Sequence, residues 1–118
     1  LSRMRTKLPH VSPAELAELL ETQTEIAILD VQSPAMANIQ SNRIRGAVHL
    51  DLRLIGKKNW LPSFSTQAVV EVYCSCPNDV SALKAAYLLG RRGVKARVLT
   101  GGIDAWVQSG LPLEQSAV

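Results

Sequence analysis

The sequence lacks long hydrophobic runs. None of its 118 residues belong to an apolar stretch of the ~18 residues that a membrane-spanning helix needs. The charged, apolar and small-residue segments of a secretory signal peptide are also missing. Because the chain begins at Leu1 and not at a methionine, we expect it to be a piece of a longer protein. With 47% hydrophobic residues, the composition is that of one soluble domain with its own core.

Cysteine and histidine are scarce. The two cysteines, Cys74 and Cys76, are separated by one residue, and the two histidines are His10 and His49. A C-x-C pair cannot join distant parts of a fold, and it is not the C-x-x-C of a dithiol redox site. A four-ligand zinc site would need all four residues, gathered from three regions. We therefore expect no metal and no cofactor, and a reducing, cytoplasmic compartment.

The positive charge of the chain is small and scattered. The net charge is +3, and the basic pairs at 57–58 and 91–92 have no interleaved aromatic residues, so we expect no nucleic acid partner. Residues 1–11 carry three Lys or Arg side chains and no periodicity. We interpret them as a basic leader or linker, with attraction to an anionic membrane surface as the alternative. A single domain over 12–118 follows.

Helical and strand-like segments alternate along this domain. Ser12-Pro13-Ala14-Glu15 is a capping box with proline at the first helical position, so a helix is expected to run from there to about Glu21. Periodicity predicts further helices at 33–40 and 79–92 and after Gly102 to near Gly110, and strands at 26–31, 45–50, 68–75 and 96–99. A long connection that can hold a helical turn covers 51–66. The alternation predicts an α/β fold with a mostly parallel sheet.

Cys76 stands where a predicted strand ends and a helix begins. Free backbone N–H groups and the helix dipole favour a thiolate there, so its pKa should fall below the free-cysteine value of about 8.5. The same N–H groups could hold an anionic sulfur species beyond the carboxyl end of the strand. A buried, inert thiol is the alternative for Cys76. For Cys74 we expect simple packing in the strand, with a resolving role as the alternative.

Four segments in register resemble the rhodanese domain: Ile28–Val31, Arg43–Val48, Tyr73–Ala86 and Leu99–Trp106, followed by Gly110-Leu111-Pro112. The resemblance runs from Ser12 to Leu113. It implies a rhodanese-like three-layer fold, with a central, mostly parallel five-stranded sheet and helices on both faces. It also implies a thiosulfate or persulfide sulfurtransferase, in which the nucleophile falls on Cys76. Its partners would be a small sulfur donor and a thiol or cyanide acceptor.

The loop that would bind substrate departs from the family pattern. It consists of Cys76, Pro77, Asn78, Asp79, Val80 and Ser81. Many active members carry arginine or lysine at the sixth position, where this chain has Ser81, and often glycine where it has Asp79. A carboxylate at Asp79 can cap the helix, but at ~5 Å and an effective dielectric near 20 it would oppose a thiolate by about 3 kcal/mol. We therefore expect thiosulfate, a dianion, to be a poor donor.

Other residues are expected to support this loop. Asp30 ends a buried strand, so its carboxylate should be hydrogen-bonded, and we interpret it as orienting neighbouring loops. Arg43 and Arg45 lie where the family has Gly-His-Ile-Pro-Gly-Ala. They could supply the positive field that the loop lacks, with solvated surface arginines as the alternative. The Gly101–Gly102 pair is interpreted as a tight turn, and Trp106 as part of the core.

Two other functions remain as alternatives. A catalytically weak or inactive module for partner binding or redox sensing would explain the missing basic residue. A cysteine phosphatase or arsenate reductase would need a seven-residue loop closing with arginine, but the seventh position is Ala82.

The segment Tyr-Cys-Ser-Cys-Pro-Asn-Asp also resembles the corresponding segment of rhodanese domains attached to DedA-type bacterial membrane proteins. That resemblance implies tethering to the inner face of a bacterial membrane through the basic leader. The sequence leaves the oligomeric state open.

Overall fold

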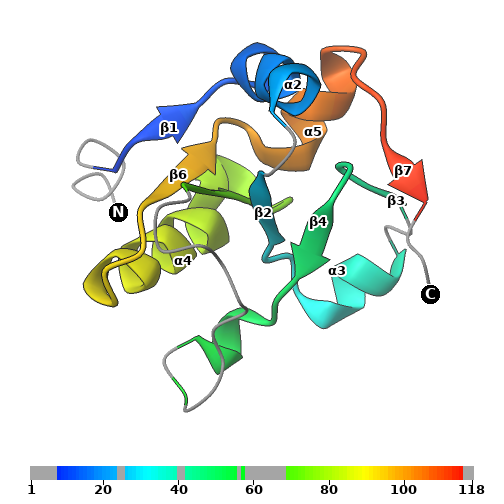
Figure 1. The fold of residues 1–118 in the computed structure, drawn as a ribbon. Coiled ribbons are helices and arrows are strands. Elements are labelled where there is room, and N and C mark those ends of the chain that lie inside the picture. Colours follow the sequence, from blue (N-terminus) through cyan, green and yellow to red (C-terminus); the bar gives the residue numbers. More distant parts are fainter. Residues whose placement is uncertain (1–7, 24–25, 40–41, 56, 58–68, 116–118) are drawn as a thin grey trace.

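A computed structural model describes residues 8–23, 26–39, 42–55, 57 and 69–115, and a parallel sheet forms its centre (Figure 1). The strands are β1 (His10–Val11), β2 (Ala27–Asp30), β4 (Ala47–His49), β5 (Val70–Tyr73) and β6 (Ala96–Leu99). Their order across the sheet is β1-β6-β5-β2-β4, and all neighbouring strands are parallel. The predicted α/β fold with a five-stranded parallel sheet is confirmed.

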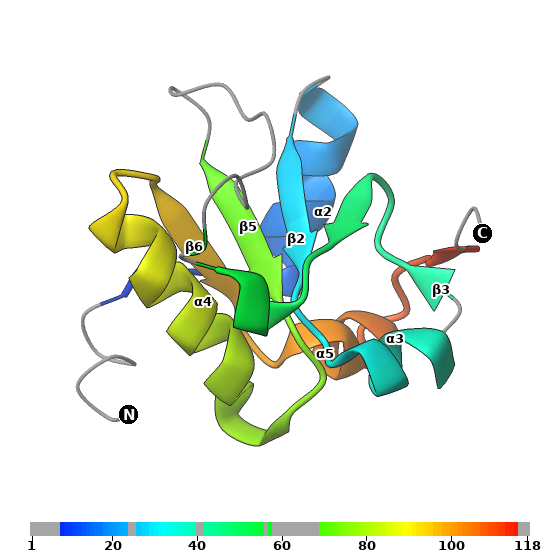
Figure 2. The ribbon, with the colours of Figure 1, turned by 90° about the horizontal axis from the view of Figure 1, so that it is seen from below.

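Helices cover both faces of this sheet. They are α2 (Pro13–Thr22), α3 (Pro34–Ile39), α4 (Val80–Arg91) and α5 (Gly102–Gln108), with two short 3-10 helices, η1 (Leu52–Leu54) and η2 (Pro77–Asp79). In Figures 1 and 2, α2 and α5 lie on one face and α4 on the other. The start of α2 follows the predicted capping box: the Glu15 N–H donates to Ser12 Oγ at 3.1 Å, and Ser12 N–H donates to Glu15 Oε1 at 3.1 Å.

The core has two halves, one on each face of the sheet. Leu29 and Val72 pack with Leu83 and Leu89 of α4, whereas Ile28 packs with Leu16 of α2 on the opposite face. Successive residues of a strand point to opposite faces, so a strand covered on both sides is mainly apolar. This explains the apolar residues 27–29 of β2 and the apolar residues of β5 other than Glu71.

One charged pair crosses the middle of the sheet. Glu71 of β5 is only 2% exposed, and it lies in register with Arg97 of β6. The Arg97 guanidinium donates to the Glu71 carboxylate, with Nε 3.0 Å from Oε1. Burial raises the pKa of Glu71, and the hydrogen bonds and charge of Arg97 oppose that rise. The apolar pattern of the strand therefore tolerates a carboxylate here because a neighbouring strand supplies its partner.

Three very short strands were not predicted. His10 and Val11 form β1 at the edge of the main sheet, held by Val98 N–H to Pro9 O (3.0 Å) and Thr100 N–H to Val11 O (2.9 Å). The strands β3 (Asn42–Arg43) and β7 (Glu114–Gln115) form a separate antiparallel pair. A strand of two residues has no periodicity, so only its distant partner reveals it.

Some boundaries differ from the predicted ones. The strand expected over 45–50 is shorter, because Gly46 adopts φ 81° in a turn that precedes Ala47. Within the predicted connection 51–66, η1 forms the expected helical turn, whereas residues 56 and 58–66 lie outside the described residues. Residues 1–7 of the predicted leader also lie outside them.

Candidate active site

The loop from β5 to α4 lies at the carboxyl edge of the sheet. Figure 2 shows it at the lower edge, beside α5. Cys76 comes three residues after the end of β5 and directly before η2, so it has the position of a helix N-cap. Ligands of open parallel sheets bind at this edge. The predicted nucleophile is therefore in the part of the fold where a substrate is expected.

The loop turns sharply at two residues with left-handed backbone. Pro77 has the fixed φ of a first helical position, and Asn78 and Asp79 follow with φ 57° and 58°. Asn and Asp tolerate this conformation better than other residues with side chains. The turn reverses the chain so that the N–H of Ser81 points back at the sulfur of Cys76, 3.2 Å away.

The Cys76 sulfur sits among hydrogen-bond donors. Besides the Ser81 N–H, it is bonded by the Ser81 hydroxyl and by the Cys74 thiol, with 2.8 Å between the two Sγ atoms. Partial burial alone would raise the pKa of Cys76, but these hydrogen bonds outweigh it and hold the pKa below the usual value. These hydrogen bonds favour the thiolate, which is the nucleophilic form of cysteine.

Cys74 has the opposite character. It is 1% exposed, and burial together with its hydrogen bond to Cys76 raises its pKa to about 12. The thiol therefore stays protonated near neutral pH. The sequence predicted a packed strand residue, and the structure adds direct contact with the Cys76 sulfur.

Asp79 ties the loop to the next turn of the chain. Its side chain is buried, and Oδ2 accepts the Gly101 N–H at 3.0 Å. It makes no capping hydrogen bond to its own helix, so the expected helix cap is not formed. This hydrogen bond connects η2 to the turn before α5 and stabilises their relative position.

Gly102 lets this turn approach the loop closely. Its φ is 60°, and a Cβ at this position would overlap the carbonyl oxygen of Cys74. That same oxygen accepts the Ile103 N–H at 3.1 Å. The glycine pair is the tight turn expected from the sequence, and it also fixes the backbone of Cys74.

Asp30 lies buried at the end of β2, in register with Tyr73. Its Oδ1 accepts the Gln32 N–H at 2.9 Å and its Oδ2 the Gln32 side-chain amide at 3.0 Å. The Tyr73 hydroxyl donates to Oδ2 at 3.4 Å, and Arg43 Nε lies 3.8 Å from the same oxygen. Burial and the Asp30 charge raise the pKa of Tyr73. Asp30 therefore joins three segments at the carboxyl edge.

Sequence reasoning missed Tyr73 and Gln32 as the partners of Asp30. A signal existed for Tyr73, because Asp30 and Tyr73 both end apolar strands. Parallel neighbours bring their last residues together at one edge of the sheet. No comparable signal identified Gln32.

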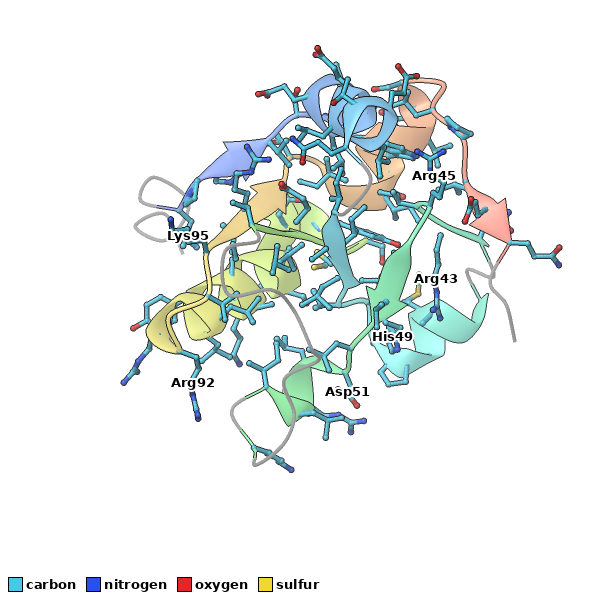
Figure 3. All side chains as sticks on the ribbon, in the orientation of Figure 1. Arg43, Arg45, His49, Asp51, Arg92 and Lys95 are labelled. Atoms are coloured by element: carbon cyan, nitrogen blue, oxygen red, sulfur yellow. The ribbon has the colours of Figure 1, made fainter. Side chains whose placement is uncertain are left out.

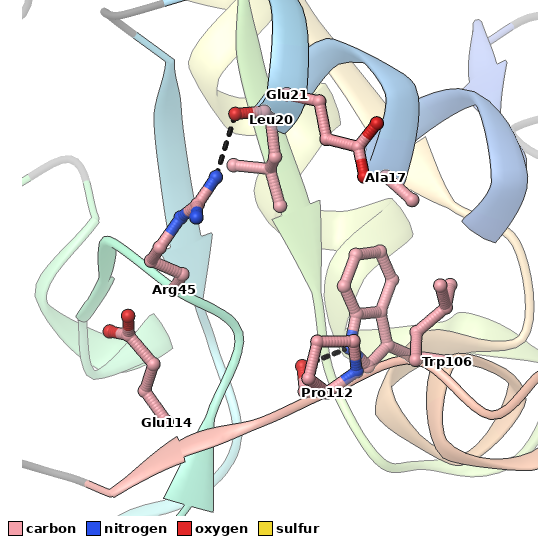
Figure 4. A pocket seen from close by; sticks show the side chains of 8 residues that line it. Ala17, Leu20, Glu21, Arg45, Trp106, Pro112 and Glu114 are labelled. Carbon is pink, nitrogen blue, oxygen red and sulfur yellow. Dashed lines mark hydrogen bonds between the residues drawn. The ribbon is translucent and has the colours of Figure 1, made fainter.

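The two candidate arginines, Arg43 and Arg45, lie in different parts of the structure. Figure 3 shows Arg43 beside α3 and Arg45 beside α2. Arg45 precedes β4 and donates to Leu20 O at 2.7 Å, where it borders a pocket of about 230 Å³ with Trp106 and Glu114 (Figure 4). The amino end of β4 is opposite the carboxyl edge that holds Cys76. Arg45 is therefore not brought to the sulfur, whereas Arg43 reaches Asp30.

A second pocket, of about 510 Å³, opens beside the loop. Its lining residues are Val31, Ser33, Pro34, Ala35, Asp51, Leu52, Arg53 and Ser81. The cation among them is already paired: Arg53 Nη2 lies 2.7 Å from Asp51 Oδ2. That pairing lowers the pKa of Asp51 to about 2. The pocket beside Ser81 is thus mainly apolar, and its charged side chains are paired with each other.

Neither a metal-binding cluster nor a membrane-spanning helix is found among the described residues. Across the described ranges, no three His, Cys, Asp or Glu side chains gather as metal ligands would. No helix in the same ranges has the length and apolar character needed to span a membrane.

Comparison with known proteins identifies the family. The model of the rhodanese-like domain matches residues 12–109. No curated protein matches the chain in sequence. Among solved structures, a protein of Anabaena sp. shares 26% identity at a TM-score of 0.75, with 92% of this chain and 94% of that chain covered. A rhodanese-like domain protein of Staphylococcus aureus shares 22% identity at a TM-score of 0.71, with 84% and 91% covered.

A protein of Rhodopseudomonas palustris, described as of unknown function and a possible tyrosine phosphatase, shares 17% identity at a TM-score of 0.78, with 96% of this chain and 89% of that chain covered. Likeness at that level of identity shows the fold alone. The family match covers most of the described sheet and helices, and it includes the whole loop from β5 to α4. The chain belongs to the rhodanese-like domain family.

Proposed function

We propose that this domain is a sulfurtransferase that carries a sulfane sulfur as a persulfide on Cys76. The observation that supports this most is the environment of the Cys76 sulfur. It is partly exposed, its pKa is lowered, and it accepts hydrogen bonds from the N–H and hydroxyl of Ser81. A thiolate held in this way is an activated nucleophile.

The reaction divides into two displacements. In the first, the Cys76 thiolate attacks the outer sulfur of a donor, a new S–S bond forms, and the donor leaves as a thiolate or as sulfite. In the second, an acceptor thiolate or cyanide attacks the outer sulfur of the persulfide, and Cys76 leaves as a thiolate again. The Ser81 N–H and hydroxyl stabilise the anionic sulfur before and after each displacement.

The pocket beside Ser81 favours an organic persulfide as donor. Apolar residues such as Val31 and Leu52 line it, and Arg53 is occupied by Asp51. Asp79 adds a further negative charge to the loop. A dianion such as thiosulfate finds no unpaired cation among these lining residues, whereas the carbon chain of an organic donor finds apolar surface.

A partner-binding module is the second candidate. The observation that favours it is the absence of a basic side chain in the loop, whose sixth position is Ser81. Phosphatase chemistry is disfavoured by the same loop. Its seventh position is Ala82, which is buried and has no guanidinium for a tetrahedral oxyanion.

Sulfur transfer to cyanide tests the proposal. The protein is incubated with a low-molecular-weight organic persulfide and cyanide, and thiocyanate is measured over time. We expect turnover above background in the unmodified protein and in the control Ser75→Ala, and none in Cys76→Ser. Thiocyanate at the level of buffer alone in every sample would contradict a sulfurtransferase and leave the partner-binding module.

A further inference from the structure

Cys74 places a second thiol against the reactive sulfur, and the two displacements above leave it unused. The two Sγ atoms are 2.8 Å apart, Cys74 is 1% exposed, and Cys76 is only partly buried. Cys74 is also fixed in place, because its carbonyl oxygen accepts the Ile103 N–H and is closely packed against Gly102. The contact is therefore part of the packed loop and not of a freely moving side chain.

We propose that Cys74 is a resolving cysteine, which discharges the persulfide on Cys76 as hydrogen sulfide and leaves a Cys74–Cys76 disulfide. This inference rests on the proposed function, because it needs the persulfide to form. The persulfide then has a second fate, because its outer sulfur is released as sulfide when no external acceptor takes it.

The step balances without an added oxidant. The Cys74 sulfur attacks Cys76 Sγ, a Cys74–Cys76 bond forms, and the bond between Cys76 Sγ and the outer sulfur breaks. The outer sulfur leaves with the electron pair of that bond and takes up the proton of Cys74, so that it departs as hydrogen sulfide. The sulfane sulfur is reduced and the two thiols are oxidised. A dithiol reductant returns the pair to thiols for the next cycle.

The positions of the two sulfurs fit this displacement. Cys74 is buried and contacts Cys76 Sγ, whereas Cys76 is partly exposed, so we expect a second sulfur atom on Cys76 to extend away from Cys74 toward solvent. The attacking and leaving sulfurs then stand on opposite sides of Cys76 Sγ. Thiol–disulfide exchange proceeds by such an attack on one sulfur with departure of the other.

The protonation state of Cys74 controls the rate of sulfide release. Burial raises its pKa to about 12, so near neutral pH the thiol is a hydrogen-bond donor to Cys76 and a slow nucleophile. An external acceptor can therefore take the sulfur first. Since the attacking group must lose its proton, we expect the rate of sulfide release to increase as the pH rises toward that pKa.

A single turnover without acceptor or reductant tests the inference. Under anaerobic conditions, the full chain receives one equivalent of a low-molecular-weight persulfide, and both sulfide and intact protein mass are measured. In the unmodified protein we expect one sulfide per chain above the Cys76→Ser background, and a protein that has lost two hydrogen atoms. Peptide mapping should locate the bond between Cys74 and Cys76.

Variants separate this inference from the proposed function. Cys74→Ser and Cys74→Ala should gain and keep one sulfur atom and release no sulfide above background, whereas Ser75→Ala should behave as the unmodified chain. If the unmodified chain instead keeps the added sulfur and both thiols, the resolving role is wrong and the sulfurtransferase proposal stands. If neither Cys74 variant nor the unmodified chain reacts with the donor, the proposed function itself fails.

Discussion

The Ser81 hydroxyl offers a direct test of how the loop activates Cys76. The variant Ser81→Ala keeps the backbone N–H that lies 3.2 Å from the sulfur and removes the hydroxyl donor. A hydrogen bond to a charged acceptor stabilises it by ~1.5–3 kcal/mol. Because Cys76 is partly exposed, the low end applies, and 1.36 kcal/mol corresponds to one pKa unit. We therefore expect the pKa of Cys76 to rise by about one unit.

The pH dependence of alkylation measures this pKa. The rate constant for iodoacetamide is recorded against pH, and peptide mass identifies the alkylated cysteine. Because only the thiolate reacts, raising the pKa lowers the rate at every pH below the new midpoint and leaves the plateau at high pH nearly unchanged. Cys74 should stay unmodified near neutral pH, since burial raises its pKa to about 12.

Ser33→Ala is the matched control for this measurement. Ser33 lines the same pocket as Ser81, but its Oγ accepts the Met36 N–H at 3.2 Å instead of facing the sulfur. The midpoint should not move in this variant. An unchanged midpoint in Ser81→Ala, or an equal shift in both variants, would refute the assignment of the Ser81 hydroxyl as a thiolate donor.

Three further variants test the surroundings of the loop. In Gly102→Ala, the new Cβ overlaps the Cys74 carbonyl oxygen, so the variant should fold less stably or shift the Cys74 backbone. We expect a lower melting temperature and slower alkylation of Cys76. Wild-type values for both would contradict this. Arg97→Ala should cost about 2 kcal/mol in urea unfolding, because it leaves the buried Glu71 without its hydrogen-bond partner, and adding Glu71→Gln should restore part of this loss. Asp79→Asn tolerates the same backbone and should speed sulfur loading from thiosulfate several-fold; unchanged loading would show that charge repulsion is not limiting.

The sequence by itself determined the architecture and located the candidate nucleophile. Ser12 and Glu15 signal a helix start through contacts only three residues apart, and apolar runs such as 26–31 show that a strand is covered on both faces. Cys76 could be recognised because the end of a strand and the start of a helix are both local patterns. These features depend on neighbouring residues, which is why the sequence predicts them.

Tertiary structure alone decided which distant residues meet at the edges of the sheet. The bond from Asp79 to Gly101 joins residues 22 positions apart, and the Tyr73–Asp30 contact joins residues 43 apart. Arg43 and Arg45 are two positions apart in sequence, yet they serve opposite ends of the sheet. The Cys74–Cys76 contact joins residues two positions apart, but the turn that packs on the Cys74 backbone, at Gly102, is 28 positions away in the sequence. Such contacts are set by the register of parallel strands and by the packing of the helix after each one, which no local pattern encodes.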